Sequence, residues 1–98
     1  MDKRRKPIPK EVARADRIQF YQDIAAGKLS LQDAVKKMRS ISGMTQPEFA
    51  KHRGVSVRVI REIEAGTGNP TVKSINQIAE IFALEVAFRH KPAEVTSG

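Results

Sequence analysis

Apolar residues recur every three or four positions along the first half of the chain, which is the spacing of an amphipathic helix. One stripe predicts a helix over residues 10–26 that ends at Gly27. Its members are Val12, Ala15, Ile18, Tyr21, Ile24 and Ala25. A second stripe predicts a helix that begins after Ser30, where Asp33 completes a capping arrangement, and that ends at Gly43. Its members are Leu31, Ala34, Val35, Met38 and Ile41.

Two short helices separated by a sharp turn are predicted next. The first begins after Thr45, because Glu48 three positions later can complete a capping box. Pro47 lies in its first turn, where the missing N–H costs little. Gly54 favours the turn, since glycine adopts positive φ easily. Ser56 can then cap the second helix by accepting a backbone N–H.

The last part of the chain changes from a helical period to a period of two. After a dense turn signal at residues 66–70, Thr71 can cap a fourth core helix that runs to about residue 83. Its inward positions are Val72, Ile75, Ile78, Ala79 and Phe82. Residues 84–90 then alternate apolar and other side chains, which favours a short strand, although a frayed extension of the last helix fits the same residues. A lone strand leaves its backbone groups unpaired, so it would have to pair with its copy across a two-fold axis.

Residues 46–65 have the spacing of a helix-turn-helix unit. A small residue, Ala50, stands at the fifth place, where two short helices cross closely. Ile60 and Ile63, at the fifteenth and eighteenth places, can point into the core and leave a polar face outside. Any helical hairpin can carry these few residues, so the neighbouring motifs and the basic balance of the chain are needed to favour DNA binding.

Four short motifs are spread between about residue 31 and residue 84. They are Thr45-Gln46, Gly54-Val55-Ser56, Ile60-Arg61-Glu62-Ile63-Glu64-Ala65-Gly66 and Asn69-Pro70. Together they resemble the Cro/CI-type, or XRE, family of bacterial and phage regulators. Arg53 departs from the family pattern, which usually has an aliphatic residue before the turn glycine, so its charged head must reach solvent or find a partner.

The resemblance implies an all-α fold, a lambda-repressor-like helix-turn-helix bundle formed by residues 28–84. The extra N-terminal helix at residues 10–27 lies outside this family core, so its apolar stripe must cover the bundle or a second subunit. Residues 85–91 would form a short C-terminal strand that pairs across a dimer, as in antitoxin-like members of the HipB type. Residues 1–9 form either a flexible basic arm that reaches phosphates or the minor groove, or a solvated tail. Residues 92–98 are a loose tail.

Composition excludes several classes of protein. Among 98 residues, 18 Lys and Arg stand against 11 Asp and Glu, and the net charge of +7 favours salt-dependent association with a polyanion, although charge alone does not choose DNA over RNA. With no cysteine and two histidines, neither a metal nor another cofactor is expected. No nucleophile with a neighbouring base and no glycine-rich phosphate loop is present, so an enzyme is not expected. Without a signal peptide or an 18-residue apolar run, we expect a cytoplasmic protein that is associated with the nucleoid and not with a membrane.

Four residues near the start of the predicted recognition helix are placed to read bases: Ser56, Val57, Arg58 and Glu62. We expect Arg58 to donate two hydrogen bonds to O6 and N7 of a guanine, or else to bind a phosphate. Val57 stands where the core does not need an apolar residue, so it would contact a thymine methyl group or be an exposed valine without a role. Glu62 can accept a hydrogen bond from a cytosine amino group, or it can orient Arg58, which lies four residues earlier. The orienting role is favoured.

Six polar residues around that helix are expected to bind phosphates. They are Gln46, Lys51, Arg61, Thr67, Asn69 and Lys73. The resemblance places Gln46 at a phosphate, aided by the positive end of the helix that it begins. It also implies that Arg39 and Glu64 form an ion pair that ties the first core helix to the recognition helix.

These features predict a homodimeric repressor that places two recognition helices in successive major grooves of a palindromic DNA operator, about 34–36 Å apart. Its size and terminal strand also fit the autoregulating antitoxin of a toxin–antitoxin pair, which would bind a toxin protein as well. The alternative from another class is a protein-binding module that docks a toxin or a polymerase without specific DNA reading. RNA binding is less favoured, because most of the five aromatic residues fall on apolar stripes.

Overall fold

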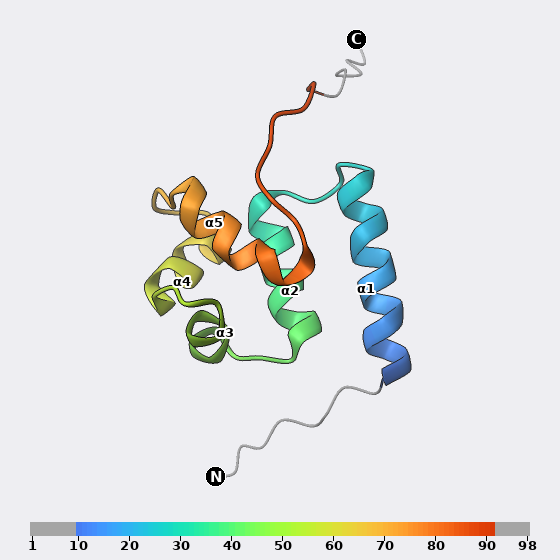
Figure 1. The fold of residues 1–98 in the computed structure, drawn as a ribbon, viewed down its shortest axis with the longest axis horizontal. Helices are drawn as coiled ribbons and strands as arrows, with labels where there is room; N and C mark the ends of the chain where they lie inside the picture. Colours follow the sequence, from blue (N-terminus) through green and yellow to red (C-terminus); the bar gives the residue numbers. More distant parts are fainter. Residues whose placement is uncertain (1–9, 92–98) are drawn as a thin grey trace.

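The computed structural model describes residues 10–91 of the chain, and within that range it is built from helices without a strand. The elements are α1 (Lys10–Ala25), α2 (Leu31–Ser42), α3 (Gln46–Arg53), α4 (Val57–Ala65), α5 (Val72–Ala79) and a 3-10 turn, η1 (Glu80–Phe82) (Figure 1). The predicted all-α helix-turn-helix bundle is therefore confirmed. The predicted basic arm at residues 1–9 and the tail at residues 92–98 lie outside the described residues.

The helix boundaries follow from local capping chemistry. The hydroxyl of Thr45 accepts from the Glu48 N–H at 3.3 Å, while the Glu48 carboxylate accepts from the Thr45 N–H at 2.9 Å. The side chains of Ser30, Ser56 and Thr71 each accept from an N–H three residues later and so cap α2, α4 and α5, without the reciprocal bond found at Thr45. Each cap satisfies an N–H that the helix leaves without a partner, so the predicted helix starts are confirmed.

The turn between α3 and α4 depends on two small residues. Gly54 has a φ of 72°, in the left-handed region that side chains rarely adopt. Ala50 is buried where α3 packs closely against α4. These two positions allow the chain to reverse within a few residues, as the spacing of the sequence predicted.

One hydrophobic core lies between α2, α3, α4 and α5 and extends to α1. Its buried residues are Phe20, Ala34, Val35, Met38, Ile41, Phe49, Ala50, Ile60, Ile63, Ile75, Ile78, Ala79 and Phe82. Two residues predicted to face this core, Leu31 and Val72, are exposed instead. Each is the first residue of its helix, and a helical side chain leans toward the N-terminus, so both side chains project past the end of the core.

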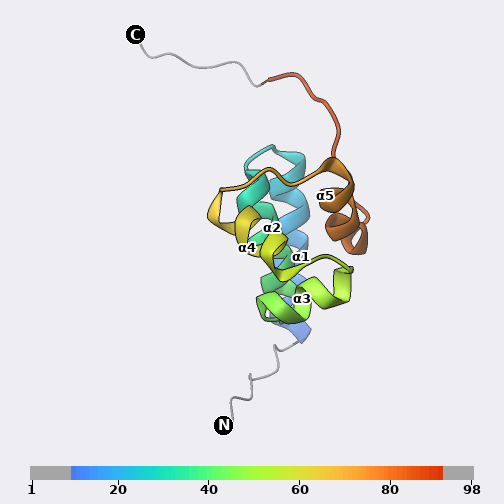
Figure 2. The same ribbon diagram turned by 90° about the vertical axis from the view of Figure 1, so that its left-hand side faces the viewer.

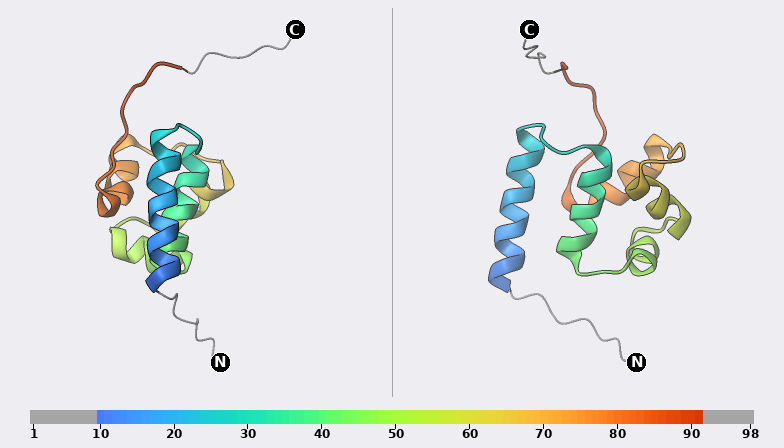
Figure 3. Two further views of the ribbon diagram at one scale, coloured as in Figure 1. Left: turned by 90° about the vertical axis from the view of Figure 1, so that its right-hand side faces the viewer. Right: turned by 180° about the vertical axis from the view of Figure 1, so that it is seen from behind.

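Helix α1 packs on α2 of the same chain, on the side of the bundle away from α3 and α4 (Figures 1 and 3). Phe20 is 1% exposed, and its ring meets that of Phe82 edge-on at 5.2 Å. The Tyr21 hydroxyl donates to the Phe82 carbonyl at 2.8 Å, and the Arg17 guanidinium lies 5.3 Å from the centre of the Phe82 ring. The extra helix therefore covers its own domain.

The apolar stripe predicted for this helix was only partly right: Ile24 packs against the core and Tyr21 contacts Phe82, but other members are exposed. Phe20, which the stripe omitted, is the buried residue, whereas Ile18 is 53% exposed and Ala15 and Ala25 are exposed. The packed face includes Arg17, whose guanidinium can cover an aromatic ring while it stays in contact with water. Apolar spacing alone could not reveal a contact face that contains a cation.

Replacing Tyr21 by phenylalanine tests the attachment of α1. The change removes only the hydroxyl that donates to the Phe82 carbonyl, so we expect the free energy of unfolding to fall by about 0.5–1.5 kcal/mol. Urea unfolding of the two proteins measures the difference. The control is Gln22→Ala on the exposed side of the same helix, which should change stability by less. Equal effects of the two substitutions would refute the proposed anchoring role of the hydroxyl.

The end of the chain differs from the prediction in two respects. The fourth core helix, expected to continue to about residue 83, ends as an α-helix at Ala79 and continues as the short turn η1. The predicted strand is not formed, since residues 84–91 have no regular structure and extend from the bundle (Figure 1). A strand needs a neighbour for its backbone groups, and in this part of the chain the N–H of Val86 instead donates to the side-chain oxygen of Asn76 at 2.7 Å. The alternation of side chains was thus insufficient to predict a strand.

Candidate nucleic-acid interface

Helix α4 has one face in the core and one face in solvent, and it lies on the side of the bundle opposite α1 (Figure 2). Ile60 and Ile63 are buried, as predicted. The side chain of Arg58 is 84% exposed, about half a helical turn from Ile60. The first turn of α4 therefore exposes the Arg58 cation to solvent, while Ile60 and Ile63 pack the opposite face of the helix into the core.

Val57 does not match the expectation that the core leaves it free. It is half-buried and packs against the edge of the hydrophobic core. It is also the first residue of α4, next to the Ser56 cap, so part of its side chain remains accessible. From the sequence, Val57 could be recognised as an apolar residue in addition to Ile60 and Ile63. That the core extends far enough to contact it became clear only from the structure.

Glu62 is held between Arg58 and the loop that follows α4. The Arg58 Nε donates to the Glu62 carboxylate at 2.9 Å, which is the geometry expected of an orienting residue. A Cβ at Gly68 would meet the same carboxylate, so a side chain there would force Glu62 to move. The hydrogen bond to Glu62 therefore orients the Arg58 guanidinium.

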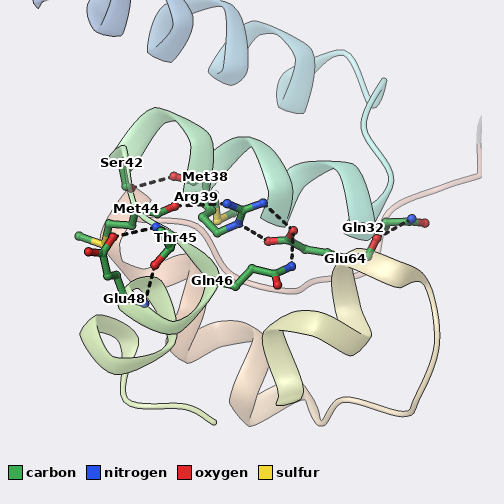
Figure 4. Close-up of polar contacts among 9 residues, drawn as sticks. All are labelled: Gln32, Met38, Arg39, Ser42, Met44, Thr45, Gln46, Glu48 and Glu64. Carbon is green, nitrogen blue, oxygen red and sulfur yellow. Dashed lines mark hydrogen bonds and ion pairs between the residues drawn. The ribbon is translucent and has the colours of Figure 1, made fainter. Parts of the chain in front are cut away.

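A partly buried polar cluster, centred on the buried Glu64, joins α2, α3 and α4 (Figure 4). Arg39 donates to both carboxylate oxygens of Glu64, at 2.7 and 2.9 Å, and to the Met44 carbonyl at 3.2 Å. The Gln46 amide donates to the same carboxylate at 3.0 Å, and the Gln32 amide to the Glu64 carbonyl at 2.7 Å. The ion pair implied by the family resemblance is confirmed, and it fixes the recognition helix against the first core helix.

The cluster keeps Glu64 ionised although its side chain is only 5% exposed. Burial by itself raises the pKa of this carboxyl, but hydrogen bonds from Arg39 and Gln46 and the positive charges of Arg39 and Lys36 together lower its pKa below the usual value. The hydrogen bond to Glu64 in turn raises the pKa of Arg39. Both groups are therefore charged at neutral pH, and each depends on the other.

The lowered pKa of Glu64 predicts a specific loss of stability in acid. A carboxyl whose pKa is lower in the folded chain stabilises it above the unfolded pKa, about 4.3 for glutamate, and this contribution disappears as the pH falls through the lowered value. We expect the stability difference between the wild-type chain and Glu64→Gln to shrink as the pH drops below about 4.3. Urea unfolding at several pH values measures it. A difference that stays constant between neutral pH and pH 3 would contradict this account.

The structure places four of the six expected phosphate-binding residues near α4. Gln46 is half-buried at the start of α3 and belongs to the Glu64 cluster. Arg61 is exposed on α4, and Thr67 and Asn69 are exposed in the loop beside Glu62 and Gly68. These residues surround the outer face of α4.

The other two expected phosphate-binding residues lie elsewhere on the surface. Lys51 lines a hollow between α2 and α3 with Ser42 and Glu48. Lys73 lines another hollow at α5, with Asn76 as a neighbour. No contact links either lysine to Arg58 in the part of the chain that the structure describes.

Arg53 has a partner that sequence reasoning missed. Its side chain is only 14% exposed, and its guanidinium donates to the Gln77 carbonyl of α5 at 3.0 and 3.2 Å. The Gln77 amide donates back to the carbonyls of Arg53 and Gly54 at 3.0 and 3.1 Å. Arg53, which departs from the family pattern, therefore connects the turn between α3 and α4 to α5 through hydrogen bonds with Gln77. No spacing rule connects positions 53 and 77, so sequence reasoning had no means of finding this pair.

Comparison with known proteins agrees with this geometry. The helix-turn-helix family model matches residues 35–88. The chain is 32% identical over 56 residues to a protein of Methanocaldococcus jannaschii named as an uncharacterized HTH-type transcriptional regulator, covering 57% of this chain and 85% of that protein. It is 34% identical over 50 residues to the Bacillus subtilis protein named as the uncharacterized HTH-type transcriptional regulator YazB, covering 51% of this chain and 72% of that protein. No solved structure matches the chain significantly.

These matches show that the chain belongs to the XRE-type helix-turn-helix family of DNA-binding regulators. Within residues 10–91, no helix is long and apolar enough to cross a membrane. In the same region, no group of three or more His, Cys, Asp or Glu side chains is placed to hold a metal ion.

Proposed function

We propose that this protein is a sequence-specific transcriptional repressor that reads double-stranded DNA with the outer face of α4. The observation that carries the proposal is the exposed Arg58 side chain, oriented by Glu62 on a helix whose opposite face is fixed in the core. An α-helix fits the major groove, and a guanidinium held in one orientation can donate to both O6 and N7 of a guanine. The site therefore supports reading of at least one base pair in each half-site.

Other residues of the first turn of α4 complete the proposed base-reading surface. Ser56 caps the helix with its side chain and is exposed, so its hydroxyl can reach a base edge or a phosphate. The accessible part of Val57 suits a thymine methyl group. Glu62 acts by holding Arg58 and is available to a cytosine amino group only if that pair opens. Discrimination by this surface would thus depend mainly on Arg58.

The proposed phosphate contacts border this surface. Gln46 is the first residue of α3, at the positive end of the helix, which is a favourable place for an anion. Arg61, Thr67 and Asn69 lie on the other sides of α4 and can bind the two flanking DNA strands. Lys51 and Lys73 would contribute at the edges of the interface. Such contacts fix the position of α4 in the groove and supply most of the salt-dependent affinity.

A dimer is proposed because one α4 helix reads too few base pairs to select a site in a genome. Two copies related by a two-fold axis would place their α4 helices about 34–36 Å apart on a palindromic operator. The fully exposed Phe88 supports a protein contact at the end of the chain. In a simple repressor that contact would be a second copy, and in an autoregulating antitoxin it would also include a toxin.

Selection of DNA duplexes from a random library by the full chain tests this function. We expect a palindromic sequence to be enriched, with half-sites separated by about one helical turn, or 10–10.5 base pairs. The selected duplex should bind better than a random duplex at physiological salt, and RNA of the same sequence should not compete. Binding that is equal for every duplex would instead indicate a basic surface without a reading function, as in a module that docks other proteins.

A further inference from the structure

Three residues of α2 lie on the face that meets the end of α4. Gln32 and Arg39 both bond to Glu64, one to its carbonyl and the other to its carboxylate. Lys36 stands four residues after Gln32 and three before Arg39, so helical geometry places it on the same face, between them. Its charge helps to lower the pKa of Glu64, which agrees with this position.

The charge of Lys36 is not needed to neutralise Glu64. The Glu64 carboxylate already receives two hydrogen bonds from Arg39 and one from Gln46. Lys36 itself is exposed and forms no ion pair with a carboxylate in the described part of the chain. Lys36 and Arg39 contribute two positive charges against one negative charge on Glu64, so these three residues together carry one excess positive charge at the junction of α2 and α4.

We infer that Lys36 is a further phosphate-binding residue, which extends the DNA interface from α3 and α4 onto α2. This inference rests on the proposed function. Lys36 and Gln46 both act on Glu64, Gln46 through a hydrogen bond and Lys36 through its charge. An exposed ammonium on this face of α2 suits the same stretch of DNA backbone as Gln46, which begins α3 at its positive end. Lys36 lies on α2 rather than on the helix that enters the groove, and an ammonium is a point charge without the fork that pairs with a guanine. It therefore adds affinity and not sequence preference.

The inference is tested by comparing Lys36→Ala with Lys37→Ala in the full chain. The two lysines are adjacent on α2, both are exposed, and both substitutions remove one positive charge, but the side chains point about 100° apart around the helix. The measurement is the binding constant for a random 30-base-pair duplex at several salt concentrations. We expect Lys36→Ala to lower the slope of log affinity against log salt by about 1, whereas Lys37→Ala leaves it unchanged. Lys36→Arg, which keeps the charge, should restore the slope.

The outcomes separate this inference from the proposed function. Wild-type binding to duplex with equal slopes for the two alanine variants would overturn the role of Lys36 alone. A wild-type chain that binds no duplex would overturn the proposed function together with it. The urea unfolding midpoints of both variants are to be compared with that of the wild-type chain. Unchanged midpoints would exclude unfolding as the cause of a difference in slope. A loss that is larger on a selected operator than on random duplex would also overturn the assignment, because it would indicate base reading.

Discussion

Replacing Arg39 by alanine is expected to lower the free energy of unfolding by about 3–5 kcal/mol, the usual cost of leaving one member of a buried ion pair without its partner. The Glu64 carboxylate, 5% exposed, would lose two charge-assisted hydrogen bonds and would keep only the bond from Gln46. The Met44 carbonyl would lose a donor as well. Because the Arg39 side chain is 26% exposed, water can partly replace it, and the lower end of the range is expected. Urea unfolding at neutral pH measures the change.

The exposed ion pair of the same domain provides the control. Arg58→Ala also removes an arginine from a glutamate, but the Arg58 side chain is largely in solvent, and such pairs contribute at most about 1 kcal/mol. The two variants therefore have the same change of charge and different burial. If Arg39→Ala cost no more than Arg58→Ala, the cluster would not be what fixes α4 against α2.

The second large effect is expected in DNA recognition. Arg58→Ala should reduce the preference for the selected operator over random duplex by about 1–3 kcal/mol, which is roughly a 5- to 150-fold loss of discrimination. The physical reason is that alanine cannot donate to the O6 and N7 atoms of a guanine, while the fold and the remaining basic residues stay in place. Competition titrations with both duplexes at one salt concentration measure the change.

Arg61→Ala is the matched control for that experiment. It removes the same charge from the same helix, and Arg61 is exposed beside the proposed phosphate contacts. We expect Arg61→Ala to weaken binding to operator and random duplex alike. Equal losses on both duplexes for Arg58→Ala would show that Arg58 binds a phosphate, which was the alternative that the sequence left open.

The fold was predictable where one residue satisfies a local requirement of the backbone, such as a helix cap or a positive φ. The caps at Thr45, Ser56 and Thr71 satisfy N–H groups within three residues, and Gly54 supplies a positive φ. Such requirements do not depend on the rest of the molecule, so sequence alone reveals them. The core stripe of α2 was predictable for the same reason, apart from Leu31 at the helix end.

The errors arose where a contact depends on distant parts of the chain. The packed face of α1 contains Phe20, which the predicted stripe omitted, and a cation over the Phe82 ring, which no apolar period reveals. Residues 84–91 alternate like a strand, but a strand forms only where a neighbour supplies hydrogen bonds. The pair formed by Arg53 and Gln77 depends on how α3 meets α5. These features became clear only from the packed structure.

The candidate site shows the same division. Family resemblance led to the pair of Arg39 and Glu64, and helical spacing led to the pair of Arg58 and Glu62. The partial burial of Val57 could not be predicted, because it depends on how far the core extends along α4. Which residues touch DNA remains a prediction.

Protection of guanine N7 from dimethyl sulfate on the selected operator tests the central claim most directly, because N7 lies in the major groove. The account predicts that the wild-type chain protects at least one guanine in each half-site, and that Arg58→Ala loses protection at that guanine while it keeps the rest of the footprint. Wild-type binding that leaves every guanine N7 reactive, or protection that is unchanged in Arg58→Ala, would contradict it.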